Sequence, residues 1–141
     1  MKKGYSQFIY LFVLLFGISI AHCKKAKEQI EKNYVISVMT SGHWVVQQFT
    51  EATIDETTEF TPYEFQFTAD GKVYGIEGVN QTPGTWVGDA SALTIQTDFP
   101  AANDTLTKLN DTWKIIDSSP TMVKAKPTNS SRDAYLMLVK K

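Results

Sequence analysis

Apolar and polar residues alternate along most of the chain after residue 42, whereas the first forty residues show no such alternation. In YEFQFT (63–68), Tyr63, Phe65 and Phe67 fall on one side and Glu, Gln and Thr on the other. A period of two is typical of an antiparallel strand with one buried face. Comparable short runs cover 43–49, 73–78, 84–88, 93–98, 112–117, 121–126 and 134–140. The pattern therefore predicts eight short strands.

Turn signals separate these runs and make most connections short. Asp70-Gly71 follows the 63–68 run directly, and glycine adopts the positive φ of a tight hairpin turn without strain. Two connections, 50–62 and 99–110, are longer. Regularly spaced short strands predict a sandwich or a barrel, and closure into a barrel removes exposed sheet edges. We expect an all-β, eight-stranded antiparallel up-and-down barrel over 41–141.

The first part of the chain has the order of an export signal. Lys2 and Lys3 precede an uncharged, mostly apolar run of thirteen residues at 8–20, and lysines resume at Lys24. This length suits the apolar region of a signal peptide and is short for crossing a bilayer. We therefore predict a signal peptide over 1–22 and exclude it from the fold.

Two alternative cleavage sites fit the end of the predicted signal peptide. Ser19-Ile20-Ala21 fits the small-x-small rule for ordinary secretory cleavage after Ala21. Alternatively, IAHC (20–23) resembles a bacterial lipobox, which implies that Cys23 is acylated and becomes the first residue. His22 departs from the lipobox pattern, which has a small residue before the cysteine.

Cys23 is the only cysteine, so the chain forms no intramolecular disulfide and no cysteine-based metal site. Its position at the end of the apolar run favours a lipid-attachment site. The following CKK resembles lipoproteins of Bacteroidetes, and its basic start implies the periplasm-facing side of the outer membrane. Plain secretion is the alternative location.

Residues 23–40 are predicted to form a lipidated tether or a short helix that leads into the barrel. Ile30, Tyr34 and Val38 are spaced four apart, which places them on one face of a helix.

Gly42-x-Trp44, at the start of the first predicted strand, resembles the G-x-W signature of lipocalins. GTW (84–86) and DTWKI (111–115) resemble motifs of lipocalin-like lipoproteins from Bacteroidetes. The resemblance implies a calycin-type barrel whose floor is closed by Trp44. It also implies a cationic side chain near the last strand that packs across this tryptophan, a role that Arg132, the only arginine, would fill. The domain is shorter than a typical lipocalin and has no disulfide.

Composition gives little support to catalysis. Removal of 1–22 leaves His43 as the only histidine, which argues against histidine-rich metal sites and histidine-paired dyads. G-x-S-x-G, H-E-x-x-H and P-loop motifs are absent from the sequence, so we predict no enzyme, no metal and no cofactor. The sequence leaves open a catalytic site made of two carboxylates, because two strands can bring any two carboxylates together. With 14 Lys and Arg against 15 Asp and Glu, nucleic acid is an improbable partner.

Aromatic residues carry the binding hypothesis. If the barrel is open, they line an apolar pocket for a small apolar or amphipathic ligand; if not, they fill the barrel. The candidates are Tyr63, Phe65, Phe67, Tyr74, Trp86 and Trp113. Non-catalytic ligand binding inside a membrane-anchored barrel is the leading hypothesis. A filled barrel that acts as a protein-interaction or envelope-structural module is the alternative.

Overall fold

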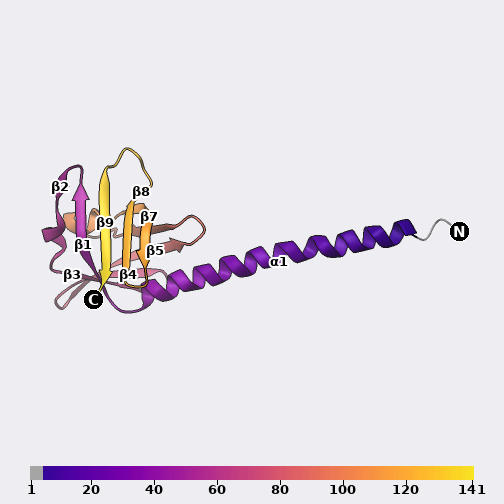
Figure 1. Cartoon of the computed structure of the whole chain (residues 1–141). Coiled ribbons are helices and arrows are strands. Elements are labelled where there is room, and N and C mark those ends of the chain that lie inside the picture. Colours follow the sequence, from indigo (N-terminus) through magenta and orange to yellow (C-terminus); the bar gives the residue numbers. More distant parts are fainter. Residues whose placement is uncertain (1–4) are drawn as a thin grey trace.

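The chain folds into a long N-terminal helix followed by a closed antiparallel barrel (Figure 1). The computed structural model describes the backbone of residues 5–141 and the side chains of residues 23–141. The helical elements are α1 (Tyr5–Thr40), η1 (Thr57–Phe60) and α2 (Asp104–Thr107). The strands are β1 (Trp44–Glu51), β2 (Ile54–Asp55), β3 (Tyr63–Phe67), β4 (Lys72–Glu77), β5 (Asn80–Asp89), β6 (Thr94–Asp98), β7 (Asp111–Ser119), β8 (Met122–Pro127) and β9 (Ala134–Lys140).

The strand order is β2-β1-β3-β4-β5-β6-β7-β8-β9, and β1 also pairs with β9. This pairing closes the sheet, so the predicted eight-stranded up-and-down barrel is confirmed, with the two-residue strand β2 as an addition. The alternation has its expected effect on β3, where Tyr63, Phe65 and Phe67 are buried and the two residues between them are partly exposed. The core consists of such inward-facing residues from all sides of the barrel.

The junction between β1 and β3 is the weakest part of the barrel wall, because these strands pair only at Trp44 and Phe65. Farther along β1, residues of the 50–62 connection take the place of a neighbouring strand. The hydroxyl of Thr57 accepts a hydrogen bond from the Phe49 N–H (2.9 Å), and the Phe49 carbonyl accepts one from the Glu56 N–H (3.0 Å). These bonds satisfy the backbone of β1 where β3 has diverged.

Helix α1 points away from the barrel, and only its C-terminal turns pack on the end where β1 begins and β9 ends (Figure 1). Val35 and Val38 are partly buried there and Met39 is fully buried. Ile30 and Tyr34 are exposed over 69% and 59% of their surfaces, so neither is buried against the barrel as Val38 is. Of the two alternatives predicted for residues 23–40, a tether or a short helix, the structure has the helix, and this helix starts earlier than expected. Among residues with described side chains, no helix is both long and apolar enough for a membrane span.

The last residue of the chain is joined to the start of β1. The N–H of Lys141 donates to the His43 carbonyl (2.9 Å), while Nδ1 of His43 lies 2.9 Å from Oε2 of Glu64. The ammonium of Lys141 also hydrogen-bonds Glu64. The hydrogen bonds from Lys141 and then His43 lower the pKa of Glu64.

This cluster predicts a measurable acid sensitivity. Because the folded state lowers the pKa of Glu64, the resulting stability is present above about pH 4.5 and is lost as the pH falls through the folded-state pKa. We expect Glu64→Gln to reduce the drop in melting temperature between pH 7 and pH 3, measured by circular dichroism. Glu77→Gln, which alters an exposed carboxylate, is the control. Equal drops in both variants would contradict the assignment.

Candidate functional site

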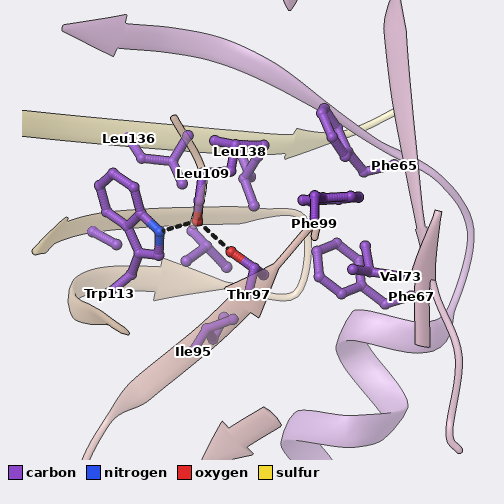
Figure 2. Close-up of a pocket in the computed structure, with 12 residues that line it drawn as sticks. Phe65, Phe67, Val73, Ile95, Thr97, Phe99, Leu109, Trp113, Leu136 and Leu138 are labelled. Atoms are coloured by element: carbon purple, nitrogen blue, oxygen red, sulfur yellow. Dashed lines mark hydrogen bonds between the residues drawn. The ribbon is translucent and has the colours of Figure 1, made fainter. Parts of the chain in front are cut away.

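The barrel interior contains a cavity of only about 30 Å³ (Figure 2). An apolar cavity of about 150 Å³ holds benzene, and pockets for drug-sized ligands start near 300 Å³. The space inside this barrel therefore has no room for an organic ligand. Its lining is Phe65, Phe67, Val73, Ile95, Thr97, Phe99, Leu109, Trp113, Val123, Ala125, Leu136 and Leu138.

The interior is filled in part by the connection between β6 and β7, residues 99–110, which we call the cap. Phe99, Leu106 and Leu109 of the cap are buried in the core. A Cβ atom at Gly75 would lie 3.0 Å from Cδ1 of Leu106, and one at Gly84 would lie 2.7 Å from Cδ1 of Phe99. These two glycines thus leave the space on β4 and β5 that the cap side chains occupy.

Hydrogen bonds to the carbonyl of Leu109 hold the cap against the inside of the barrel wall. The carbonyl of Leu109 accepts from Nε1 of Trp113 (2.9 Å) and from the hydroxyl of Thr97 (2.5 Å), as Figure 2 shows. Among residues with described side chains, every buried side-chain nitrogen and oxygen has a hydrogen-bond partner. The interior therefore offers no free polar group that would orient a ligand.

Charged side chains hold the outward-facing side of the cap at Lys108, next to Leu109. Lys108 pairs with Glu56 (2.9 Å) and Glu59 (2.8 Å), both from the 50–62 connection. Its hydrogen bond with Glu59 raises the pKa of Lys108 against the opposing effect of burial, and Glu56 adds to the rise. The acidic connection is thus used to close this end of the barrel.

Arg132 joins the same layer from the segment before β9. Its guanidinium binds both carboxylate oxygens of Glu51 (2.9 and 3.1 Å), one oxygen of Asp111 (2.8 Å) and the carbonyl of Lys108 (2.7 Å). It also lies 5.3 Å from the ring centroid of Trp113. Burial lowers the pKa of Arg132, but the hydrogen bonds with Glu51 and Asp111 outweigh it, so the net shift is upward.

No protein-family model matches the chain, and no curated protein matches it. Its fold is similar to the crystal structure of a DUF4847 family protein from Bacteroides vulgatus, with a TM-score of 0.56, 15% identity, and coverage of 76% of this chain and 97% of that chain. A lipocalin-like protein from Bacteroides uniformis is also similar, with a TM-score of 0.46, 15% identity, and coverage of 72% and 98%. With eight antiparallel strands in up-and-down order and β1 paired to β9, the barrel is lipocalin-like in its fold.

Most of the predicted ligand-binding residues of this lipocalin-like barrel are buried, but not around an open pocket. Phe65, Phe67 and Trp113 line the small cavity. The hydroxyl of Tyr63 accepts a hydrogen bond from Nδ2 of the cap residue Asn103 (2.6 Å). Trp86 lies at the α1 end, and its Nε1 donates to the Thr68 carbonyl (2.9 Å).

Tyr74 is the exception, and the prediction that it lines the interior is wrong. Its neighbours Val73 and Gly75 face the core, so the alternation of β4 places Tyr74 on the outer face, where it is partly exposed. The inward residues of the cap were not predicted from the sequence. Their signal is weak: Asn103 caps a single helical turn, accepting from the Leu106 N–H (3.0 Å), in a connection that mixes polar and apolar residues without a regular period.

Trp44 closes the α1 end of the lipocalin-like barrel, but its cationic partner is not the predicted one. Its Nε1 donates to the Met39 carbonyl (2.9 Å), and Nζ of Lys140 lies 5.0 Å from its ring centroid. Gly42, with a φ of 78°, makes the turn between α1 and β1 beside Lys140. The prediction that Arg132 packs across Trp44 is therefore wrong.

The strand register explains this correction. Trp44 pairs with Lys140 at one end of the β1–β9 ladder, and Glu51 pairs with Ala134 at the other. A residue that precedes β9, as Arg132 does, must lie at the opposite end of the barrel from Trp44. In the part of the chain with described side chains, no three His, Cys, Asp or Glu residues are placed to hold a metal ion.

Proposed function

We propose that this chain is an exported, lipid-anchored binding module of the cell envelope whose lipocalin-like barrel is a filled scaffold with its binding surface outside. Lipocalin-like folds are typical of non-catalytic binding proteins, which supports a binding role over an enzyme. The observation that carries the proposal is the interior cavity of about 30 Å³, closed by the cap and without a free polar group. This favours an interaction or envelope-structural module over a carrier.

Cys23 supplies the anchor in this proposal. Its side chain is exposed on α1, and the helix from Cys23 to Thr40 is about 25 Å long at about 1.5 Å per residue. Acylation with two or three chains, at roughly 0.8 kcal/mol per buried CH₂, would hold the protein stably at a membrane. The helix would then separate the barrel from the bilayer surface, on the periplasm-facing side of the outer membrane in our proposal.

A second candidate is a carrier whose cap moves aside. Gly75 and Gly84 leave one position each on the inner faces of β4 and β5 without a side chain, and Leu106 and Phe99 of the cap occupy that space. Withdrawal of the cap would give a small apolar ligand the same space. This candidate requires the ion pairs of Lys108 and Arg132 to break.

Native mass spectrometry of the protein purified from its own membrane tests the anchor and the filled interior together. We expect an acyl mass on Cys23 and no small molecule held inside the barrel, and we expect Cys23→Ala to leave the membrane fraction because it has no site for acylation. An unmodified chain that starts at His22 would contradict the anchor. A retained apolar molecule that shifts the ¹H–¹⁵N signal of the indole of Trp113, which lines the interior cavity, would contradict the filled scaffold and support the carrier.

A further inference from the structure

A second hollow lies outside the barrel wall, between the last turns of α1 and strands β7 and β8. We call it the α1 groove, and its volume is about 190 Å³. Val35 and Val38 form the α1 side, and Ile115 and Pro120 form the barrel side. The groove is several times larger than the interior cavity and exceeds the roughly 150 Å³ that holds a benzene ring.

The floor of the α1 groove consists of Ile95 and Val123, which also line the interior cavity. Both side chains are buried, so they form a thin apolar partition between the groove and the core. The groove is thus an outward continuation of the hydrophobic core that the C-terminal turns of α1 cover only partly.

The absence of charged side chains in the α1 groove determines which kind of molecule can bind there. None of the residues that line the groove carries a charge, and the polar ones, Tyr34, Ser118 and Ser119, supply hydroxyl groups. Tyr34 and Ser118 are exposed. Burial of an ion against this lining would be costly, whereas an uncharged polar group at the hydroxyl-bearing rim keeps its contact with water.

We propose that the α1 groove binds the alkyl chain of a single-chain amphiphile with an uncharged headgroup. Its volume lies below the roughly 300 Å³ at which pockets for drug-sized molecules start, which favours one chain over a two-chain lipid. The proposal rests on the proposed function in one respect: binding takes place outside the filled interior. It does not depend on acylation of Cys23.

The three tryptophans report separately on the relevant parts of the molecule. Nε1 of Trp44 donates to the carbonyl of Met39, which lines the groove, whereas Nε1 of Trp113 donates to the cap carbonyl of Leu109. Trp86 reports on the turn after β3 through the Thr68 carbonyl. Their three indole N–H signals in a ¹H–¹⁵N spectrum therefore distinguish the groove from the interior.

The experiment titrates octyl glucoside, below its micelle concentration, into the chain from Cys23 onward. This chain contains every residue of the described core, and a dispersed amide spectrum is required first as proof that it folds. The full chain in lipid nanodiscs is expected to give the same three signals. We expect a saturable shift of the Trp44 signal with the Trp113 signal unchanged. Hexyl glucoside, with two fewer CH₂ groups, is expected to bind about tenfold more weakly.

Neighbouring isoleucines of β7 provide a matched pair of variants. Ile115 lines the groove, whereas Ile116 is 52% exposed and does not. We expect Ile115→Glu to weaken binding by more than about tenfold and Ile116→Glu to change it by less than about twofold, because only the first places a charge in the groove. Ser118→Phe, which fills the groove from its exposed rim, gives the same loss if Ile115→Glu does not fold.

Four outcomes would overturn the inference. An unchanged Trp44 signal, or equal binding by both isoleucine variants, would show that the groove does not bind the probe. A shift of Trp113 would place the probe in the interior and support the carrier instead. Analytical ultracentrifugation tests whether a second copy of the chain occupies the groove. That is the case if the protein is a dimer that octyl glucoside leaves intact and that Ile115→Glu dissociates.

Discussion

Leu106→Ala is expected to lower the free energy of unfolding by about 3 kcal/mol. Leu106 is fully buried although it lies in a connection between strands, and its side chain packs against the inner face of β4. Truncation of a buried leucine removes its hydrophobic transfer energy and leaves a cavity, which together cost about 2–5 kcal/mol. Urea unfolding followed by tryptophan fluorescence measures the loss.

Gly75→Ala tests whether Leu106 fills the space that the glycine leaves. In the native sequence the new Cβ would lie 3.0 and 3.2 Å from the two terminal methyl groups of Leu106, so we expect a loss of about 1 kcal/mol. In the Leu106→Ala background the same methyl enters vacant space and is expected to be stabilising. The change of sign is the coupling that a double-mutant cycle measures.

Val79→Ala is the control for these two variants, because Val79 is 97% exposed at a hairpin tip. We expect it to change stability by less than about 0.5 kcal/mol. A loss below about 1 kcal/mol for Leu106→Ala would mean that the cap contributes little to the core. That result would make cap movement easy and would favour the carrier.

Local alternation was enough to predict the strands of the barrel but not the contents of its interior. Strands such as β3 can be predicted because a half-buried strand requires a period of two in its own residues. The cap has no such period: a single helical turn and two flanking segments place Phe99, Leu106 and Leu109 in the core. These residues are buried because distant strands leave space for them. No sequence pattern within 99–110 indicates that this space exists.

The error at Tyr74 has the same physical origin. A strand with the sequence VYGIE has two possible inward faces, and one of them carries a glycine that contributes no hydrophobic side chain. Gly75 nevertheless faces inward, because Leu106 supplies the apolar group that the strand itself lacks. The correct face of β4 becomes evident only when the cap is in place.

The wrong prediction for the cationic partner of Trp44 arose because the two candidate residues lie at opposite ends of β9. Arg132 and Lys140 both flank or end β9, and the sequence alone does not show which of them reaches the first tryptophan of β1. Pairing of Trp44 with Lys140 decides it, since the start of β1 meets the end of β9. Arg132 is instead left at the cap end, over Trp113.

Arg132→Met is expected to lower the free energy of unfolding by about 3 kcal/mol. The side chains of Arg132 and Asp111 are 20% and 17% exposed, so the substitution leaves a largely buried carboxylate without its partner. Loss of one member of a buried ion pair costs about 3–5 kcal/mol, and partial exposure here favours the lower end. The Glu51 carboxylate and the Lys108 carbonyl lose hydrogen bonds as well.

Two further variants separate the charge of Arg132 from its shape. Arg132→Lys keeps the charge, but an ammonium cannot make the forked contact with both oxygens of Glu51, so we expect about half of the loss. Asp111→Asn in the Arg132→Met background is expected to recover stability, because it removes the unpaired charge.

Lys124→Met provides the comparison with a more exposed ion pair, since Lys124 binds Asp117 on the outside of the barrel at 2.9 Å. Exposed pairs contribute about 0–1 kcal/mol, so this variant is expected to unfold at nearly the native urea concentration. If Arg132→Met is no more harmful than Lys124→Met, the Arg132 cluster does not hold the cap. In that case the ion pairs at the cap end would oppose opening only weakly, and the interior of the barrel would be accessible to a ligand at small cost.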